Sequence, residues 1–251
     1  MDIVEYAQMA QMALMVAVAT FCQNLTGFAF GLIFVGASGA LHLMPIADAA
    51  NVASVLSVIN GAVYLRSHSF APRWDWLRPM LLSGVCGVGL GLGLLYWLSG
   101  ATLNGLRALL GVSIVACAVL LLARSRQRAT PSPVSVLWGV GLLSGVLGGL
   151  FSTAGPPIVY HMYRQPLPAT VVRQCLVAMF LACSGVRLAV VLATGGMPWH
   201  TAGACALAVP VVAGVTWLQA RHPPRLPVEA VRWLVCGLLL LAGGSLLASA
   251  R

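Results

Sequence analysis

Long, nearly uncharged apolar segments alternate with short polar ones along the chain, and this pattern predicts the helices. Six apolar segments are each long enough for a helix to cross a hydrocarbon layer of about 30 Å. They cover residues 47–65, 77–98, 102–123, 169–193, 199–219 and 228–249. We therefore expect an all-α, polytopic integral membrane protein with six full spans.

Two further apolar regions are interrupted by small and polar residues. The first covers about residues 8–44 and contains Thr26, Gly27 and Gly31. The second covers about residues 135–165 and contains the motif GGLFSTAGPPIVYH, which begins at Gly148. Each region is too long for one helix. We predict that each forms a broken-helix hairpin or a re-entrant pair of half-helices.

The order of one broken region and three spans occurs twice. Between the two sets lies the polar, proline-bearing segment RSRQRATPSP. At a shift of about 123 residues Pro45 corresponds to Pro168 and Trp76 to Trp199. We predict two membrane repeats joined by a linker, with boundaries at residues 1–123, 124–134 and 135–251.

The arginines predict how the repeats are oriented. Only 8% of the residues are charged, the net charge is +9, and the arginines gather in loops 66–78 and 221–232 and in the linker. Loops 99–104 and 194–200 carry no Lys or Arg. The positive-inside rule places the arginine-rich loops in the cytoplasm and both termini outside. The charge is thus an orientation signal, and we expect no nucleic-acid partner. The two halves then face opposite ways, which is the inverted repeat common among secondary transporters.

A broken helix at membrane depth exposes backbone N–H groups that can bind an anion. We therefore predict a site for a small anion at the two breaks, lined by Thr26, Gly27, Gly31, Ser152, Thr153, Gly155 and Pro156. The alternative is that the glycines serve packing only, since Gly141, Gly145 and Gly149 recur at every fourth position. We assign the glycine pairs of the second span, Gly87–Gly91 and Gly89–Gly93, to packing.

Several polar residues within apolar segments leave two interpretations open. Arg187 lies about six residues inside its span, so it either binds the anion or reaches the interface. Arg173 and Arg107 lie closer to span ends, which favours the interface. His161 follows the second break and either contacts the ligand, shuttles a proton or lies at the interface. Asn24 and Asn60 either line a cavity or bond to neighbouring helices.

Motifs for catalysis are lacking in this sequence. It contains no GxSxG, HExxH or Walker motif, and its seven cysteines form no CxxC pair. We expect no enzyme activity, no cofactor and no metal site. Without a nucleotide motif, active transport would use a proton, another ion or the membrane potential.

Three stretches carry a family resemblance: TGFAFGLIFVG at 26–36, SGVLGGLFSTAGPPIVYHMY at 144–163 and RQCLVAMFLACSGVR at 173–187. The sequence resembles the TauE/SafE sulfite-exporter family of membrane permeases. The resemblance implies a bacterial-type cell membrane and transport of sulfite, a sulfonate, thiosulfate or a related anion. We predict a secondary transporter working by alternating access; the alternative is an anion-binding membrane sensor or subunit without transport.

Overall fold

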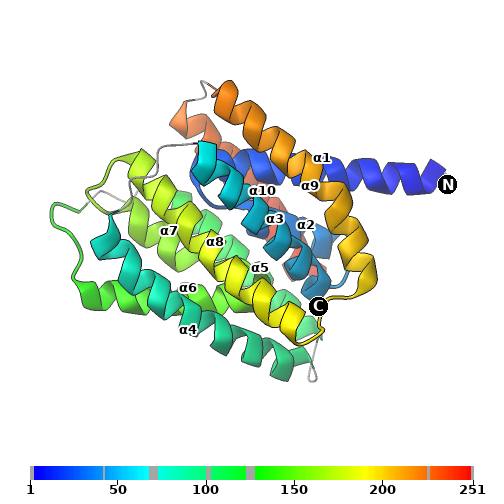
Figure 1. Cartoon of the computed structure of the whole chain (residues 1–251), viewed down its shortest axis with the longest axis horizontal. Coiled ribbons are helices and arrows are strands. Elements are labelled where there is room, and N and C mark those ends of the chain that lie inside the picture. Colours follow the sequence, from blue (N-terminus) through cyan, green and yellow to red (C-terminus); the bar gives the residue numbers. More distant parts are fainter. Residues whose placement is uncertain are drawn as a thin grey trace.

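The computed structural model describes residues 3–41, 43–67, 73–99, 103–122, 128–224 and 227–249, and these form ten α-helices (Figure 1). Their bounds are α1 Ile3–Thr26, α2 Phe30–Ala40, α3 Ile46–Ser67, α4 Trp74–Ser99, α5 Leu103–Leu122, α6 Val134–Phe151, α7 Gly155–Tyr163, α8 Ala169–Ala193, α9 Trp199–Arg221 and α10 Val228–Ser249. Within this part of the chain, eight helices are long and apolar enough to cross a membrane. The predicted all-α, multi-pass membrane protein is confirmed.

The six predicted spans correspond to α3, α4, α5, α8, α9 and α10. The predicted and observed bounds of α8 and α10 are the same, and the others differ by at most three residues. The agreement follows from the length of the apolar runs, because polar loops leave little choice of where such a helix can begin or end.

Both interrupted regions contain a helix break, as predicted. α1 ends at Thr26 and α2 begins at Phe30, while α6 ends at Phe151 and α7 begins at Gly155. The two arms of each region differ in length: α1 and α6 are long enough to span, whereas α2 and α7 have 11 and 9 residues. Each region is therefore a long helix followed by a short return helix.

Left-handed backbone conformations produce both breaks. Gly27 has φ of 80° and Ser152 has φ of 57°, and a residue in this region ends an α-helix. Pro156 and Pro157 then occupy the first turn of α7, where a missing N–H removes no intrahelical hydrogen bond. The sequence signals that predicted the breaks are thus their direct causes.

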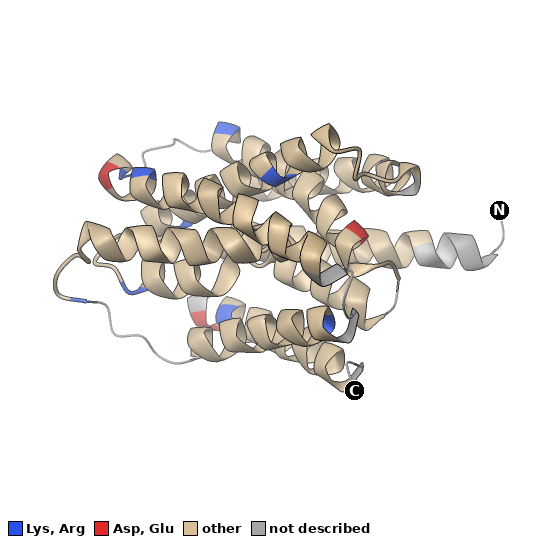
Figure 2. Ribbon diagram, turned by 90° about the horizontal axis from the view of Figure 1, so that it is seen from below, with Lys and Arg blue, Asp and Glu red and all other residues tan. Residues whose placement is uncertain are grey.

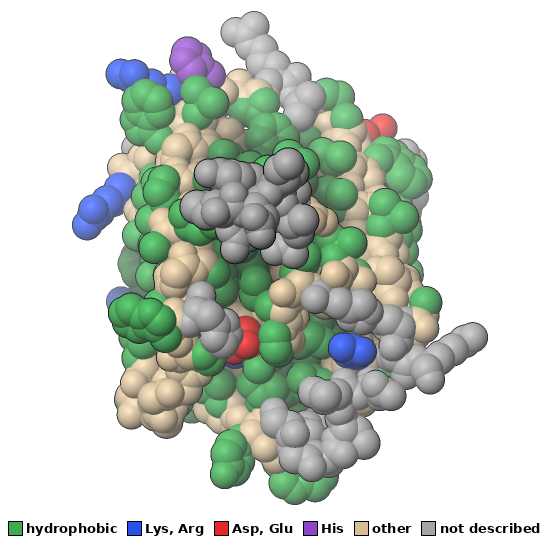
Figure 3. Space-filling model, turned by 90° about the vertical axis from the view of Figure 1, so that its right-hand side faces the viewer, with side chains coloured by type: hydrophobic (Ala, Val, Ile, Leu, Met, Phe, Trp, Pro, Cys, Tyr) green, Lys and Arg blue, Asp and Glu red, His purple; other side chains and the backbone are tan. Residues whose placement is uncertain are grey.

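The helices form one bundle in which helices of the two halves pack against each other (Figure 1). α4 runs along α6, α5 along α10, and α3 contacts both α8 and α9. α1 begins toward one end of the bundle (Figure 1), and most of the described arginines lie toward the other (Figure 2). Seen from the end where α1 begins, hydrophobic side chains predominate and charged ones are sparse (Figure 3). Along the helices, exposed large hydrophobic side chains such as Leu82, Leu90 and Leu241 give the bundle a surface that suits a bilayer.

Glycines hold α4 and α6 in close contact. A Cβ atom at Gly145 would meet the carbonyl of Gly84, and one at Gly91 would meet the carbonyl of Val146. Gly87, Gly141 and Gly149 face backbone in the same way, so the packing prediction is confirmed for these residues. It is wrong for Gly89 and Gly93, because no described residue of another helix lies within 4 Å of a Cβ built there.

Candidate functional site

The two helix breaks lie against each other inside the bundle. A Cβ atom at Gly31, in the first turn of α2, would lie 2.7 Å from the carbonyl oxygen of Ser152 and 2.8 Å from Cγ2 of Thr153. A Cβ atom at Gly155, the first residue of α7, would lie 3.0 Å from Cδ1 of Leu32. Glycine permits this approach, and the N-terminal turns of α2 and α7 therefore meet.

This junction contains buried backbone donors. The N–H groups of Phe30, Gly31 and Leu32 precede the first intrahelical bond of α2, from Ile33 to Ala29, and no described residue accepts a hydrogen bond from them. In α7 the N–H of Gly155 is in the same position. Because the next two residues of α7 are prolines, α2 supplies more of the free donors.

The predicted hydroxyl groups of the junction differ in what they bind. Thr26 Oγ1 donates to the carbonyl of Cys22 at 2.7 Å, and Ser152 Oγ accepts from Ser54 Oγ at 2.9 Å. Thr153 Oγ1 is buried, with the residue only 1% exposed, and has no hydrogen-bond partner in the part of the chain that the structure describes. Among these three hydroxyl groups, only that of Thr153 makes no hydrogen bond to the described residues.

Arg187 lies beside the second break and does not reach an interface. It is 1% exposed, and its Nε donates to the carbonyl of Gly149 at 3.0 Å. Its Nη1 donates to Asn51 Oδ1 and Ser54 Oγ, both at 2.9 Å. The snorkelling interpretation is therefore wrong. All three partners are neutral, so they accept three of the five N–H donors of Arg187 without neutralising its charge.

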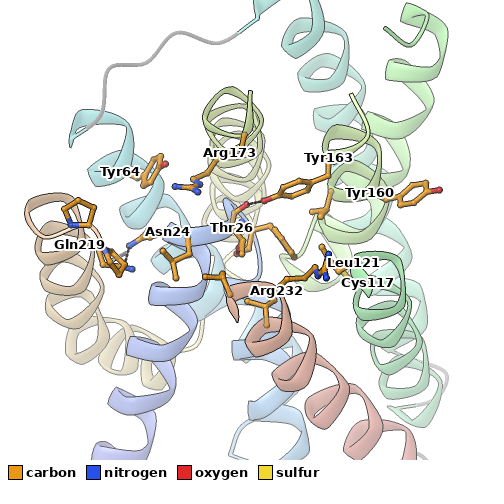
Figure 4. A pocket seen from close by; sticks show the side chains of 18 of the residues that line it. Asn24, Thr26, Tyr64, Cys117, Leu121, Tyr160, Tyr163, Arg173, Gln219 and Arg232 are labelled. Carbon is orange, nitrogen blue, oxygen red and sulfur yellow. Dashed lines mark hydrogen bonds between the residues drawn. The ribbon is translucent and has the colours of Figure 1, made fainter. Parts of the chain in front are cut away.

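A cavity of about 590 Å³ lies on the other side of the junction, among the helix ends nearest the arginine-rich loops (Figure 4). Of the predicted site residues, Thr26 and Pro156 line it. The others are not in its wall: Gly27, Gly31, Ser152, Thr153, Gly155 and Arg187. The predicted site residues thus lie in two places: most are at the closed junction, and Thr26 and Pro156 are at the inner end of an open cavity.

Polar side chains from distant segments meet in the cavity wall. Asn24 Nδ2 donates to Gln219 Oε1 at 2.7 Å and to Thr216 Oγ1 at 3.1 Å. Thr216 in turn donates to Asn60 at 2.6 Å. Asn24 therefore fits both of its interpretations, since it lines the cavity and bonds to a neighbouring helix. Thr216 and Gln219 carried no sequence signal, because α9 reads only as an apolar span.

Aromatic and basic residues complete the wall. Tyr163 donates from its hydroxyl to the carbonyl of Thr26 at 2.7 Å, which ties α7 to the end of α1 (Figure 4). Arg173, for which the sequence favoured the interface, lies in the wall beside Tyr64 (Figure 4). The position of Arg173 near a span end was the only available signal, and it pointed away from the cavity.

His161 is buried and does not line the cavity. Its Nε2 lies 2.9 Å from Nε2 of Gln165, and Gln165 also donates to Ser132 Oγ at 2.8 Å. These contacts fasten the end of α7 to the residues before α6. Among the described residues no cluster of three or more His, Cys, Asp or Glu side chains is placed to hold a metal ion.

The family model described as sulfite exporter TauE/SafE matches residues 12–246 of the chain. The chain belongs to the TauE/SafE family. This TauE/SafE protein is 29% identical over 228 residues to a protein from Cupriavidus necator named "Probable sulfite/organosulfonate exporter TauE", covering 91% of this chain and 89% of the relative. No solved structure matches this chain. The family consists of membrane transporters rather than enzymes, so the junction and the cavity are candidate transport sites.

Proposed function

We propose that this TauE/SafE protein is a secondary transporter of a small anion: sulfite, an organosulfonate or a related sulfur oxyanion. The observation that carries the proposal is the group of buried, unpaired N–H donors where α2 and α7 meet, together with the unpaired hydroxyl of Thr153. The printed name of the Cupriavidus necator relative supports the same substrate class.

An anion is the ligand that fits these donors. Each helix N-terminus carries roughly half a positive charge, and two of them meet at this junction. A buried N–H without an acceptor costs free energy, which an oxyanion would recover by accepting the hydrogen bonds. Arg187 lies beside the second break with neutral partners only, and its charge adds to the attraction.

Alternating access accounts for a junction that is closed while the cavity is open. A Cβ at Gly31 would meet backbone, so the anion enters only when the two breaks separate. Inverted repeats would make α4–α6 and α9–α1 equivalent pairs. In the α4–α6 pair, glycines of each helix face the backbone of the other, whereas the α9–α1 pair borders the cavity. Exchanging the two arrangements would close the cavity and open the opposite side.

Replacing Thr153 with Val tests the proposal. Valine keeps the shape of threonine but removes the unpaired hydroxyl, so we expect unchanged or higher thermal stability. A hydrogen bond to a charged ligand contributes about 1.5–3 kcal/mol, so the apparent KM for the anion should rise at least about tenfold. The measurement is sulfite or alkanesulfonate flux into proteoliposomes containing the purified protein.

Thr201→Val is the matched control. Thr201 Oγ1, in the first turn of α9, is also buried and unpaired but does not lie at the junction. Thr201→Val should have the same effect on thermal stability as Thr153→Val but should leave anion flux unaltered. Equal flux in the wild type and Thr153→Val, or an equal loss in both variants, would refute the anion site. Stabilisation by the anion without any flux would favour a membrane sensor.

A further inference from the structure

The cavity has charged features that a site at the helix breaks does not explain. Arg173 enters its wall from α8 and Arg232 from α10 (Figure 4). The Nε atoms of both are buried and have no hydrogen-bond partner among the described residues. Arg232 has Glu229 at 3.9 Å, whereas the neighbour of Arg173 in the cavity is the neutral side chain of Tyr64. Arg173 is therefore the stronger attractor for an anion.

The remainder of the cavity is mostly apolar. Carbon side chains from four helices and the first break face it: Leu25, Phe28, Leu120, Leu121, Val159 and Val235. The volume of about 590 Å³ lies within the range of sites for organic ligands. A bare oxyanion such as sulfite has four heavy atoms and would leave most of this apolar wall facing water.

Arg173 also contacts the first break directly. A Cβ atom at Gly27 would lie 2.9 Å from both Cγ and the carbonyl oxygen of Arg173. Phe28 and Pro156, one from each broken region, are part of the same cavity wall. A ligand bound at Arg173 is therefore adjacent to the elements that have to move for the junction to open.

We propose that this cavity is a separate loading site for an organic anion, in which Arg173 binds the charged group and the apolar wall contacts the carbon chain. The inference rests on the proposed transport function and adds a second site to it, on the cavity side of the junction. It favours a substrate with an apolar body over a bare inorganic oxyanion.

The test measures binding to the purified full-length protein as a function of chain length. Isothermal titration with sulfite and the linear sulfonates from methanesulfonate to butanesulfonate should give a Kd that falls about three- to fourfold per buried methylene. Carboxylates of the same lengths separate recognition of the sulfonate group from recognition of any organic anion. Equal slopes in the two series would support a general organic-anion site.

Three variants assign the parts of the site. Arg173→Gln should weaken every sulfonate at least about tenfold while keeping the dependence on chain length. Leu121→Asn should reduce that dependence and affect methanesulfonate little. Arg221→Gln is the control, because Arg221 lies over the ring of Trp217 at the same end of the molecule and is not in the cavity wall. It should bind like the wild type.

Different failures separate this inference from the proposed function. If the protein transports anions but binds sulfite as tightly as butanesulfonate, the loading site is refuted and anion transport is not. Unchanged sulfonate binding in Arg173→Gln, together with anion flux, would have the same meaning. A co-purified anionic phospholipid that alkanesulfonates cannot displace would also refute it. Neither binding nor flux for any anion would refute both proposals.

Discussion

At the scale of single residues, the buried side chain of Arg187 is held in place by hydrogen bonds to two other helices. Its hydrogen bonds go to Gly149 at the end of α6 and to Asn51 and Ser54 on α3. Ser54 continues the chain of contacts to Ser152 in the second break. The position of a charge inside a span was evident from the sequence, but these acceptors come from segments more than 30 residues away. Only the fold could identify them.

Arg187→Lys should destabilise the protein although it keeps the charge. A lysine ammonium is one point donor, so it cannot reach Gly149 on one side and Asn51 with Ser54 on the other. Leaving one buried acceptor or the cation itself unpaired costs about 2 kcal/mol. For a chain of this size we expect the Tm of the detergent-purified protein to fall by about 4–8 °C.

Arg107→Lys is the control for this change, because Arg107 is half-buried near the start of α5. The Tm of Arg107→Lys should stay within about 1 °C of the wild type, since substitutions away from buried hydrogen-bond networks alter stability little. Equal shifts in both variants would mean that the contacts of Arg187 do not contribute to stability.

At the scale of elements, α6 and α4 show how far the spacing of glycines predicts a close contact between helices. Its glycines at every fourth position predicted a close helix contact, and α4 is the partner. The same reasoning failed on α4, where Gly89 and Gly93 repeat the spacing but face open space. Spacing defines a stripe on one helix, whereas the rotation of that helix decides which stripe meets a neighbour.

Two alanine substitutions on α6 test this contact. At Gly145 a methyl group would collide with the backbone of Gly84, so Gly145→Ala should push α4 and α6 apart and lower the Tm. We expect a loss of about 1–3 kcal/mol. Gly139 has open space around it among the described residues, and Gly139→Ala should raise stability by up to about 1 kcal/mol through helix propensity. A rise in Tm for both variants would contradict the close packing.

At the scale of the whole molecule, the positive-inside rule predicts which end faces the cytoplasm. Residues 128–131 precede α6 at the arginine-rich end, and residues 194–196 join α8 to α9 at the other. The cavity lies at the arginine-rich end, so this orientation would make the structure an inward-open state.

Cysteine labelling checks the orientation. In a variant whose native cysteines are replaced, Thr130→Cys and Thr194→Cys would each place one exposed thiol at opposite ends. A membrane-impermeant maleimide applied to intact cells should label Thr194→Cys only, and Thr130→Cys should react only after the membrane is opened. The reverse pattern would invert the predicted topology and make the cavity outward-open.

The sequence by itself determined the membrane class, the six full spans and the two breaks. These features depend on local quantities: the length of an apolar run, and the presence of Gly27, the Ser-Thr-Ala-Gly motif and two prolines at fixed positions. Thr153 and Gly155 were likewise identified as candidates from the motif alone.

Only the tertiary structure decided how these features combine. The contact between the two breaks, the buried network of Arg187 and the cavity wall at Arg173 join segments far apart in the chain. Which buried groups remain unpaired depends on the packing of every neighbour, because a hydroxyl such as that of Thr26 finds its acceptor within its own helix while that of Thr153 finds none. Hydrophobicity decides that a segment is buried in the membrane or the protein, and three-dimensional packing decides what it meets there.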